Sequence, residues 1–350
     1  MTMRTIEKKQ LKATFLKEYN NLQKNNSFLK SSCILFVYNS TEKISRNDPH
    51  FSECVFADEI DLIRDAFNAF PSLSVNLIDS EELFIQKACY FKENYSQVYV
   101  YSMAQNIDGV GRRCLIPLIC EFFGFINISS NSRSSFLGGD KNLMNDIIKN
   151  EIKQPNRLFI TTINEREIEK FFSIHPLALL KPNSESASIG ISKLEVRNRE
   201  QMNNALIIIK NTLSIYGKVF LEEFITGKEV ECTVIPWMYG NYIAEPVEII
   251  KSSDFLDYNT VLNNQYGFKS YSATNASNIQ SFARSAYELL KFDSIARFDF
   301  IVNGNSCYLF DITPNPTISQ YSSANHAVKY IAKDARTIYQ ILFLNKCRSI

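Results

Sequence analysis

The chain has 350 residues, of which 45% are hydrophobic and 21% are charged, and 38 Lys and Arg face 37 Asp and Glu. This length exceeds that of a typical single domain, so we expect two or three domains, and the composition excludes a disordered chain. The net charge of +1 gives no support for binding to nucleic acid or to an anionic membrane, and we expect neither partner.

The N-terminal part of the chain alternates between strand-like and helix-like segments. Residues 1–30 are rich in charge and predict a helical extension. Residues 31–137 contain apolar runs of strand length, separated by segments with helical hydrophobic periodicity. The strands are expected at 33–38, 74–78, 98–101 and 125–128, and the helices at 57–70, 81–91 and 114–123. Such alternation is typical of a parallel sheet covered on both faces, which predicts an α/β domain.

Two further regions follow, 138–218 and 219–350. In the first, Asp140 is the expected N-cap of a helix that begins at Lys141. Further strands are expected at 158–162, before residue 182 and at 191–196, with helices at 165–172 and 200–213. In the second region, strands are expected at 219–225, 230–237, 242–250, 295–302 and 308–312, and helices at 279–291 and 335–344. This pattern predicts antiparallel α+β structure. The polar stretch 252–278 lacks clear periodicity and predicts a lid.

Cysteine and histidine usage limits the chemistry and the compartment. None of the eight cysteines forms a CxxC pair, and most lie in apolar runs, so we expect buried free thiols. The three histidines lack metal-ligand spacing, which argues against a His-rich zinc site. The N-terminus lacks the apolar segment of a secretory signal, and the apolar stretch 114–128 is too short to cross a bilayer. We expect a soluble, cytoplasmic protein.

Two loops carry polar groups that could contact a nucleotide. The loop 182–190 follows Lys181 and is rich in small hydroxyl residues, which let backbone N–H groups approach phosphate oxygens. An ordinary turn explains the same composition. Glu222 and Glu223 end an apolar strand, and Glu229 opens the next one. These carboxylates either accept hydrogen bonds from ribose and adenine or are simply solvated.

A third cluster lies on two consecutive strands near the C-terminus. Arg297 and Asp299 are two residues apart in an apolar strand, so their side chains point to the same face. Asp311 lies in the following strand. Carboxylates in buried strands require a partner, and two of them can hold a hard divalent ion such as Mg²⁺. An ion pair with Arg297 satisfies them equally well.

The order of these segments resembles the ATP-grasp superfamily, and most closely its D-alanine–D-alanine ligase-like branch. The resemblance covers roughly residues 30 to 345. It implies a three-domain architecture, with an N-terminal parallel-sheet domain and two α+β domains that clasp ATP. The matching segments are Gly138 to Lys141, Lys181 to Gly190, Glu222 to Glu229, Pro246 to Ile249, Ala296 to Phe300, and Asp311 to Pro316.

The resemblance also implies roles for individual residues. Lys141 and Lys181 would contact ATP phosphates. Glu222 would accept the adenine amine beside the backbone of Glu223 and Ile225, and Glu229 would bind ribose. The metal ligands would be Asp299 and Asp311 with Thr313 or Asn315, for one or two Mg²⁺ ions that Mn²⁺ can replace. The catalytic side chains would be Arg297, which stabilises an oxyanion, and Ser188 and Ser322. The expected substrate contacts are Glu42, Asp257 and Tyr258.

Three positions depart from the family pattern. Thr313 stands in place of an Asn, Ala187 in place of a loop Ser, and Val261-Leu262 in place of a Lys-Tyr pair. These changes argue against the standard D-Ala-D-Ala reaction.

We therefore expect an ATP-dependent carboxylate–amine ligase that forms an amide through an acyl phosphate. Its substrates would be small carboxylates and amines, either free amino acids or a carrier-bound acyl group. The resemblance also allows a homodimer. The alternative is a nucleotide-binding protein that has lost ligation and acts as a regulatory or scaffolding partner.

Overall fold

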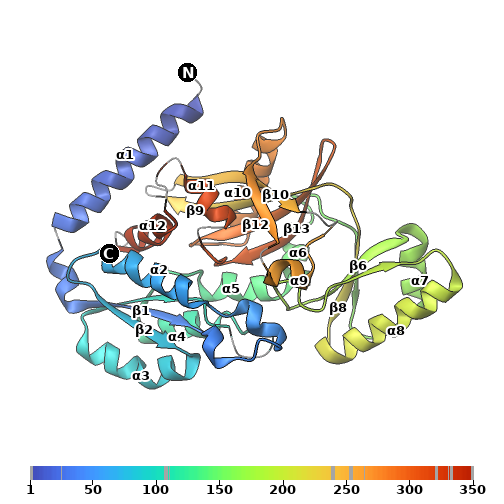
Figure 1. The fold of residues 1–350 in the computed structure, drawn as a ribbon, viewed down its shortest axis with the longest axis horizontal. Coiled ribbons are helices and arrows are strands. Elements are labelled where there is room, and N and C mark those ends of the chain that lie inside the picture. The colour runs from blue at the N-terminus through green and yellow to red at the C-terminus, as the bar shows by residue number, and fades with distance from the viewer. Residues whose placement is uncertain are drawn as a thin grey trace.

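The computed structural model describes residues 3–24, 26–105, 109, 111–237, 241–251, 255–263, 265–319, 322–329, 331 and 334–347. Three sheets organise these residues: an N-terminal sheet, a central sheet and a C-terminal sheet. The central sheet lies at one end of the molecule, and the C-terminal sheet lies between it and the N-terminal sheet (Figure 1). The mixed α/β and α+β architecture predicted from the sequence is confirmed.

The N-terminal sheet is parallel, with strand order β2-β1-β3-β4. Its strands are β1 (Ser32–Tyr38), β2 (Ser74–Asp79), β3 (Gln97–Ser102) and β4 (Ile126–Asn127). Alternate residues of β1 enter two different cores, so the continuous apolar run serves both faces. Helix α2 (Ala57–Asn68) covers one face, and α3 (Glu81–Asn94) and α4 (Leu115–Phe123) cover the other. Gly124 ends α4 in the left-handed conformation, with φ 70°.

The central sheet is antiparallel, with strand order β5-β8-β6-β7. Its strands are β5 (Arg157–Ile160), β6 (Leu177–Pro182), β7 (Ser192–Glu195) and β8 (Val219–Glu223). Helices α7 (Glu165–Ile174) and α8 (Arg199–Tyr216) bury their apolar faces against it. We expected β8 in the third region, because it follows α8 and precedes a long series of strands. It pairs instead with β5 and β6, so its carboxylates belong to the central sheet.

The C-terminal sheet is also antiparallel, with strand order β11-β10-β9-β12-β13. Its strands are β9 (Lys228–Trp237), β10 (Asn241–Lys251), β11 (Tyr266–Ser270), β12 (Ala296–Asn303) and β13 (Ser306–Pro314). One face packs against α5 (Ser132–Gly139), α6 (Lys141–Ile148) and α10 (Ala276–Leu289). We had grouped α6 with the central region, but Met144 and Ile148 belong to this core. The Asp140 side chain caps α6 as expected, accepting from Leu143 N at 3.0 Å.

The first and last helices of the chain contact each other. Helix α12 (Arg336–Cys347) packs on α2, and α1 (Met3–Lys24) places Phe15 against Trp237 of β9. Helix α11 (Ser323–Val328), which precedes α12, contacts β9 and β10. Within the described residues, no helix combines the length and apolarity needed to cross a bilayer.

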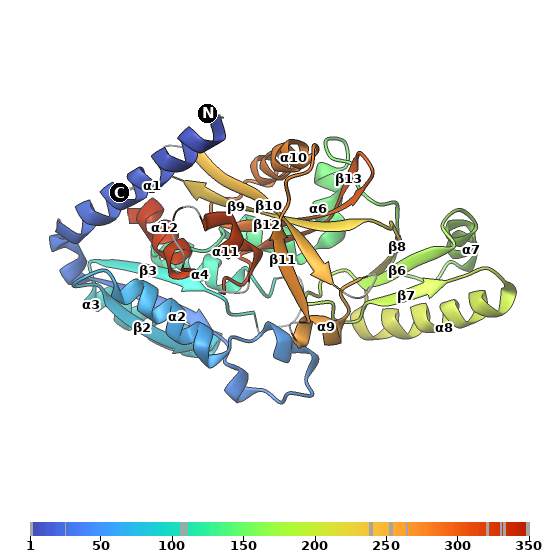
Figure 2. The ribbon, with the colours of Figure 1, turned by 45° about the horizontal axis from the view of Figure 1, so that its top comes forward.

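The stretch that predicted a lid contains regular structure. It includes α9 (Tyr258–Leu262) and the edge strand β11, which pairs with β10. Helix α9 lies close to the central sheet in both views (Figure 1, Figure 2). Residues 252–254 and 264 of this stretch lie outside the described residues.

Gly227, between β8 and β9, is packed too tightly to accept a side chain. A Cβ atom there would lie 2.4 Å from the Val302 carbonyl oxygen and 2.9 Å from Cγ2 of Ile301. Gly227→Ala is therefore expected to lower the free energy of unfolding by about 1–3 kcal/mol in urea denaturation, the usual cost of overpacking. Gly267→Ala is the control, because a Cβ atom at Gly267 meets nothing within 4 Å. Equal effects of the two substitutions would contradict the steric argument.

Candidate active site

A cavity of about 680 Å³ opens between the three sheets and collects side chains from all of them. Most of the residues singled out in the sequence line it. They are Lys141, Lys181, Ser188, Glu222, Glu223, Ile225, Glu229, Arg297, Asp299, Asp311, Thr313, Asn315 and Ser322. Three expected substrate residues, Glu42, Asp257 and Tyr258, do not.

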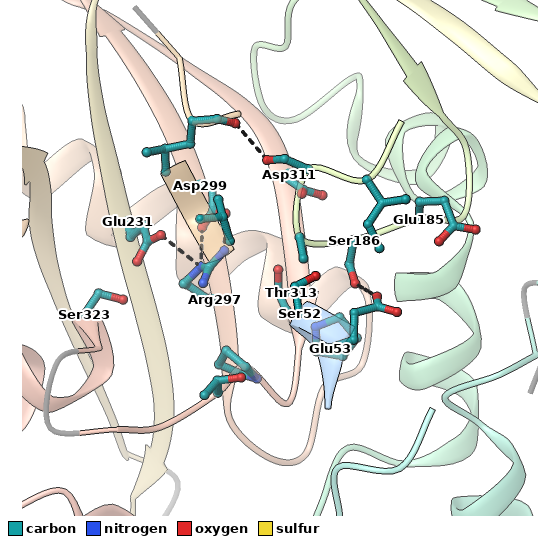
Figure 3. Close-up of a pocket in the computed structure, with 18 of the residues that line it drawn as sticks. Ser52, Glu53, Glu185, Ser186, Glu231, Arg297, Asp299, Asp311, Thr313 and Ser323 are labelled. Atoms are coloured by element: carbon teal, nitrogen blue, oxygen red, sulfur yellow. Dashed lines mark hydrogen bonds and ion pairs between the residues drawn. The ribbon is translucent and has the colours of Figure 1, made fainter. Parts of the chain in front are cut away.

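The floor of the cavity is a charged row on three neighbouring strands, β9, β12 and β13. Glu231, Asp299 and Asp311 are directly opposite one another in the register, so they share the face that looks into the cavity. Arg297 lies two residues from Asp299 on the same face. Its Nε and Nη2 atoms each donate to a different oxygen of Asp299 at 2.8 Å (Figure 3). Such a two-bond pair fixes the plane of the guanidinium group.

Glu231 is the residue of this row that the sequence analysis missed. It is 4% exposed, lies 3.4 Å from Arg297, and its Oε2 makes no hydrogen bond within the described chain. Burial raises its pKa to about 7; Arg297 opposes this rise and Asp299 adds to it. Burial also raises the pKa of Asp299, against the pull of Arg297. The sequence does carry a signal for Glu231. Glu229, Glu231 and Thr233 are two residues apart along β9, so their side chains share one face of the sheet.

Asp311 supplies the oxygen most accessible to a metal ion. Its Oδ1 accepts from Lys141 Nζ at 2.8 Å and from Ile312 N at 3.0 Å, whereas Oδ2 has no partner among the described residues. Burial would raise the pKa of Asp311, but Lys141, Lys181 and Arg297 together outweigh it and the pKa is lowered. With the nearby Thr313 hydroxyl group and Asp299, this is a set of hard oxygen donors that fits Mg²⁺.

Asn315 is also available as a metal ligand, because its buried Oδ1 makes no hydrogen bond with the described residues. Its side-chain nitrogen donates to the carbonyl oxygen of Ser102, at the end of β3, at 2.5 Å. The amide group therefore ties β13 to the N-terminal sheet.

One wall of the cavity is built on a buried ion-pair triad. Lys181 Nζ bonds Glu222 Oε1 at 2.5 Å, and Arg157 Nε bonds the other oxygen at 2.7 Å. Burial would raise the pKa of Glu222, but the two cations outweigh it and the pKa is lowered. Arg157 was not singled out in the sequence, because only the pairing of β5 with β8 brings it beside Glu222.

The two other glutamates of the predicted nucleotide loop also have protein partners. Glu223 accepts from Asn156 at 2.5 Å and lies 3.1 Å from His175 Nδ1. Glu229 pairs with Lys251, at the end of β10. Lys251 is a further cation that the sequence analysis did not identify.

The loop 182–190 bends sharply over the cavity. Ala187 and Ser188 both have positive φ, 50° and 60°, and the Ser188 hydroxyl group donates to Leu256 O at 2.8 Å. The neighbouring Ser186 bonds Glu53, from the N-terminal part of the chain. The loop is therefore more than a turn, since it links the region around α9 to the N-terminal part.

Glu53 lines the cavity, whereas Glu42, the acidic residue expected there, does not. Glu42 is exposed on the short 3-10 helix Thr41–Lys43, whereas the Glu53 side chain is only 3% exposed and pairs with Arg112. The sequence motif for this acidic residue was too loose to separate the two.

Asp257 and Tyr258, the other expected substrate contacts, lie outside the cavity. Asp257 caps α9, accepting from Thr260 N at 2.7 Å, and Tyr258 lines a separate shallow pocket beside Tyr216. Ser322 lines the cavity but also caps α11, accepting from Asn325 N at 3.4 Å.

A second group of possible metal ligands lies at the rim. Ligand atoms of His50, Glu53 and Glu185 lie within 4.8 Å of one another. Arg112 pairs with both carboxylates, so one of their two negative charges is already offset without a metal.

Comparisons with known proteins agree with this geometry. The family described as D-ala D-ala ligase C-terminus matches residues 155–339, more than half of the chain. A D-alanine–D-alanine ligase of Francisella tularensis subsp. novicida is 26% identical over 220 residues, 61% of this chain and 69% of that protein. One of Francisella philomiragia is 27% identical over 224 residues, with the same coverages, 61% and 69%.

Solved structures show the shared fold. A D-alanine–D-alanine ligase of Bacillus anthracis complexed with ATP matches with a TM-score of 0.69 and 16% identity, over 91% of this chain and 98% of that one. The VanG D-Ala:D-Ser ligase of Enterococcus faecalis matches with a TM-score of 0.66 and 18% identity, over 89% and 98%. The chain therefore belongs to the D-alanine–D-alanine ligase family of ATP-grasp ligases.

Proposed function

We propose that the protein uses ATP to join the carboxylate of one small molecule to the amine of another. One observation carries this proposal: a guanidinium group fixed by Asp299 and a free oxygen of Asp311 face the same cavity as the Lys181–Glu222 wall. Such a cavity can bring a nucleotide, an acid and an amine together, and its positioned charges suit phosphoryl transfer without a reactive histidine.

The reaction would proceed in two steps. A carboxylate oxygen of the first substrate attacks the γ-phosphorus of ATP, the bond to ADP breaks, and an acyl phosphate forms. The amine nitrogen then attacks the acyl carbon, the bond to phosphate breaks, and the amine gives up a proton. Arg297 would stabilise the oxyanion of the second step, while Lys141 and Lys181 would offset phosphate charge.

The residues that would hold Mg²⁺ are Asp311 and Asp299, with Thr313 or Asn315 as a further oxygen donor. When bound, the ion supplies positive charge to the phosphate oxygens. The site could take one or two ions, and Mn²⁺ shares the preference for oxygen ligands.

We further propose that the substrate pair is an amino acid or small peptide pair other than two D-alanines. Ala187, Val261 and Leu262 line the cavity and carry no hydroxyl or amino group that could bind a substrate. A cavity that is apolar at these three positions cannot form side-chain hydrogen bonds to a substrate there. It should therefore prefer other substrates than a cavity with polar groups at the same positions.

An ADP-release screen tests the proposal. Wild-type protein is incubated with ATP, Mg²⁺ and pools of D- and L-amino acids, and products are identified by mass spectrometry. We expect ADP release that depends on an added amino acid, and a product with the summed mass of two substrates less one water. D-alanine alone is the reference arm. Stabilisation by MgATP with no product from any pool would favour the nucleotide-binding alternative.

A further inference from the structure

One cation of the cavity has no ion-pair partner among the residues that the structure describes. Five Lys and Arg side chains line the cavity in the described part of the chain. Four of them form ion pairs: Lys141 with Asp311, Lys181 with Glu222, Lys251 with Glu229, and Arg297 with Asp299. Arg113 is the fifth, and no carboxylate of the described residues lies within ion-pair distance of it.

Neutral groups hold the Arg113 guanidinium in place. Its Nε donates to Gln105 Oε1 at 2.7 Å, and its Nη2 donates to Ser186 Oγ at 2.8 Å. A guanidinium group has five N–H donors, so three remain, including both on Nη1. The remaining edge suits a carboxylate, which can accept two parallel hydrogen bonds.

The surroundings of Arg113 make its charge costly without a ligand. Burial lowers the pKa of its guanidinium group, and Glu53 offsets this only in part. Its neighbour Arg112 differs, because it pairs with both Glu53 and Glu185. A half-buried charge without an ion-pair partner among the described residues would gain from an anionic ligand.

Arg113 bonds Ser186 of the loop 182–190, which we expect near the phosphates, but the carboxylate beside it favours a substrate acid over a phosphate. Arg113 precedes α4 of the N-terminal sheet, whereas the triad wall is built from β5, β6 and β8 of the central sheet. Ser186, which Arg113 holds, also bonds Glu53. The negative charge of Glu53, near Arg113, would repel a bound phosphate group, which carries up to two negative charges. It would repel a bound carboxylate group less, because that group carries one.

We propose that Arg113 binds a second carboxylate of the acid substrate, so that this substrate is an acidic amino acid or another dicarboxylic acid. One carboxylate would be activated at the Arg297–Asp311 row, and the other would be held at Arg113. This inference rests on the proposed ligase function and narrows its substrate class.

The test compares acids with their neutral isosteres. Aspartate, glutamate, succinate and glutarate are set against asparagine and glutamine, with D- and L-forms of each amino acid. ADP release by wild-type protein should favour the acids, with kcat/KM about 10- to 100-fold higher than for the amides. Arg113→Met should remove this preference and leave the KM for ATP within about two-fold of wild type. Arg113→Lys should retain part of the preference, because it keeps the charge but loses the planar fork.

Arg133→Met is the matched control, since Arg133 is exposed on α5 and does not line the cavity. It should behave as wild type. Equal turnover of acids and amides by wild-type protein would overturn the proposal, and so would a rise in KM for ATP that matches the loss for the acid.

Calorimetric binding separates this proposal from the ligase function itself. If no pool gives a product, the same acids and amides are titrated into wild-type protein and Arg113→Met. Tighter binding of the acids that Arg113→Met abolishes would support the anionic site without ligation, and the absence of any difference would refute it.

Discussion

Replacing Lys181 by Met is expected to abolish ATP binding and to destabilise the protein strongly. Lys181 is 6% exposed and Glu222 only 2%. Without Lys181, the buried Glu222 carboxylate keeps Arg157 as its only cation. Breaking a buried pair by removing one partner costs about 3–5 kcal/mol. Urea denaturation would measure this loss, and the shift in Tm caused by MgATP would measure nucleotide binding.

A double variant separates the two roles of Lys181. In Lys181→Met with Glu222→Gln, the buried charge has gone with its partner, so most of the stability should return. ATP binding should not return, because the cation that faces the phosphates is still missing. Recovery of ATP binding in the double variant would mean that Lys181 acts only by neutralising Glu222. Lys210→Met is the control, because the Lys210–Glu165 pair of the same sheet region is exposed and should contribute little.

The pH dependence of this effect has a definite sign. The pKa of Glu222 is lowered in the folded protein from an ordinary value of 4.5. A lowered pKa contributes stability above the unfolded value and loses it as the pH falls through the folded value. The difference between wild type and Lys181→Met should therefore narrow in acid.

Local patterns were sufficient to predict most elements of the fold. The apolar runs at 33–38 and 98–101 became the middle of the N-terminal sheet, because their alternate side chains reach two separate cores. The assignment of β8 failed because sequence position does not encode strand pairing. The edge strand β11 was missed because it is short and only half-buried, so its hydrophobic pattern is weak.

The candidate site shows the same limit. Residues inside ordered motifs, such as Lys181 and Arg297, were found because the motif spacing is local. Other residues were not found, because only tertiary structure brings Arg157 beside Glu222 and brings Glu53 and Arg113 to the cavity. No sequence pattern shows that Arg113 lacks an ion-pair partner among the described residues, since that property depends on where the nearby carboxylates lie.

Asp311→Asn is expected to leave the fold intact and to remove most of the Mg²⁺-dependent turnover. An amide has almost the shape of the carboxylate, and its oxygen can still accept from Lys141, so the packing of β13 should survive. The lost negative charge weakens metal binding. A bound metal stabilises the charge of the transition state by several kcal/mol, which corresponds to roughly a thousand-fold in rate. ADP release as a function of Mg²⁺ concentration would measure this loss.

A substitution at position 313 should strengthen Mg²⁺ binding, whereas Asp311→Asn weakens it. Because an amide oxygen binds Mg²⁺ better than a hydroxyl group does, Thr313→Asn should lower the Mg²⁺ concentration needed for half-maximal rate. Asp334→Asn serves as the control, since Asp334 pairs with Arg336 and does not line the cavity. Wild-type Mg²⁺ dependence in Asp311→Asn would place the metal elsewhere, and the rim cluster of His50, Glu53 and Glu185 would then be the next site to test. If the Mg²⁺ concentration for half-maximal rate rises in Asp311→Asn and falls in Thr313→Asn, the ion lies between these two side chains. A change in global stability could not shift this concentration in opposite directions.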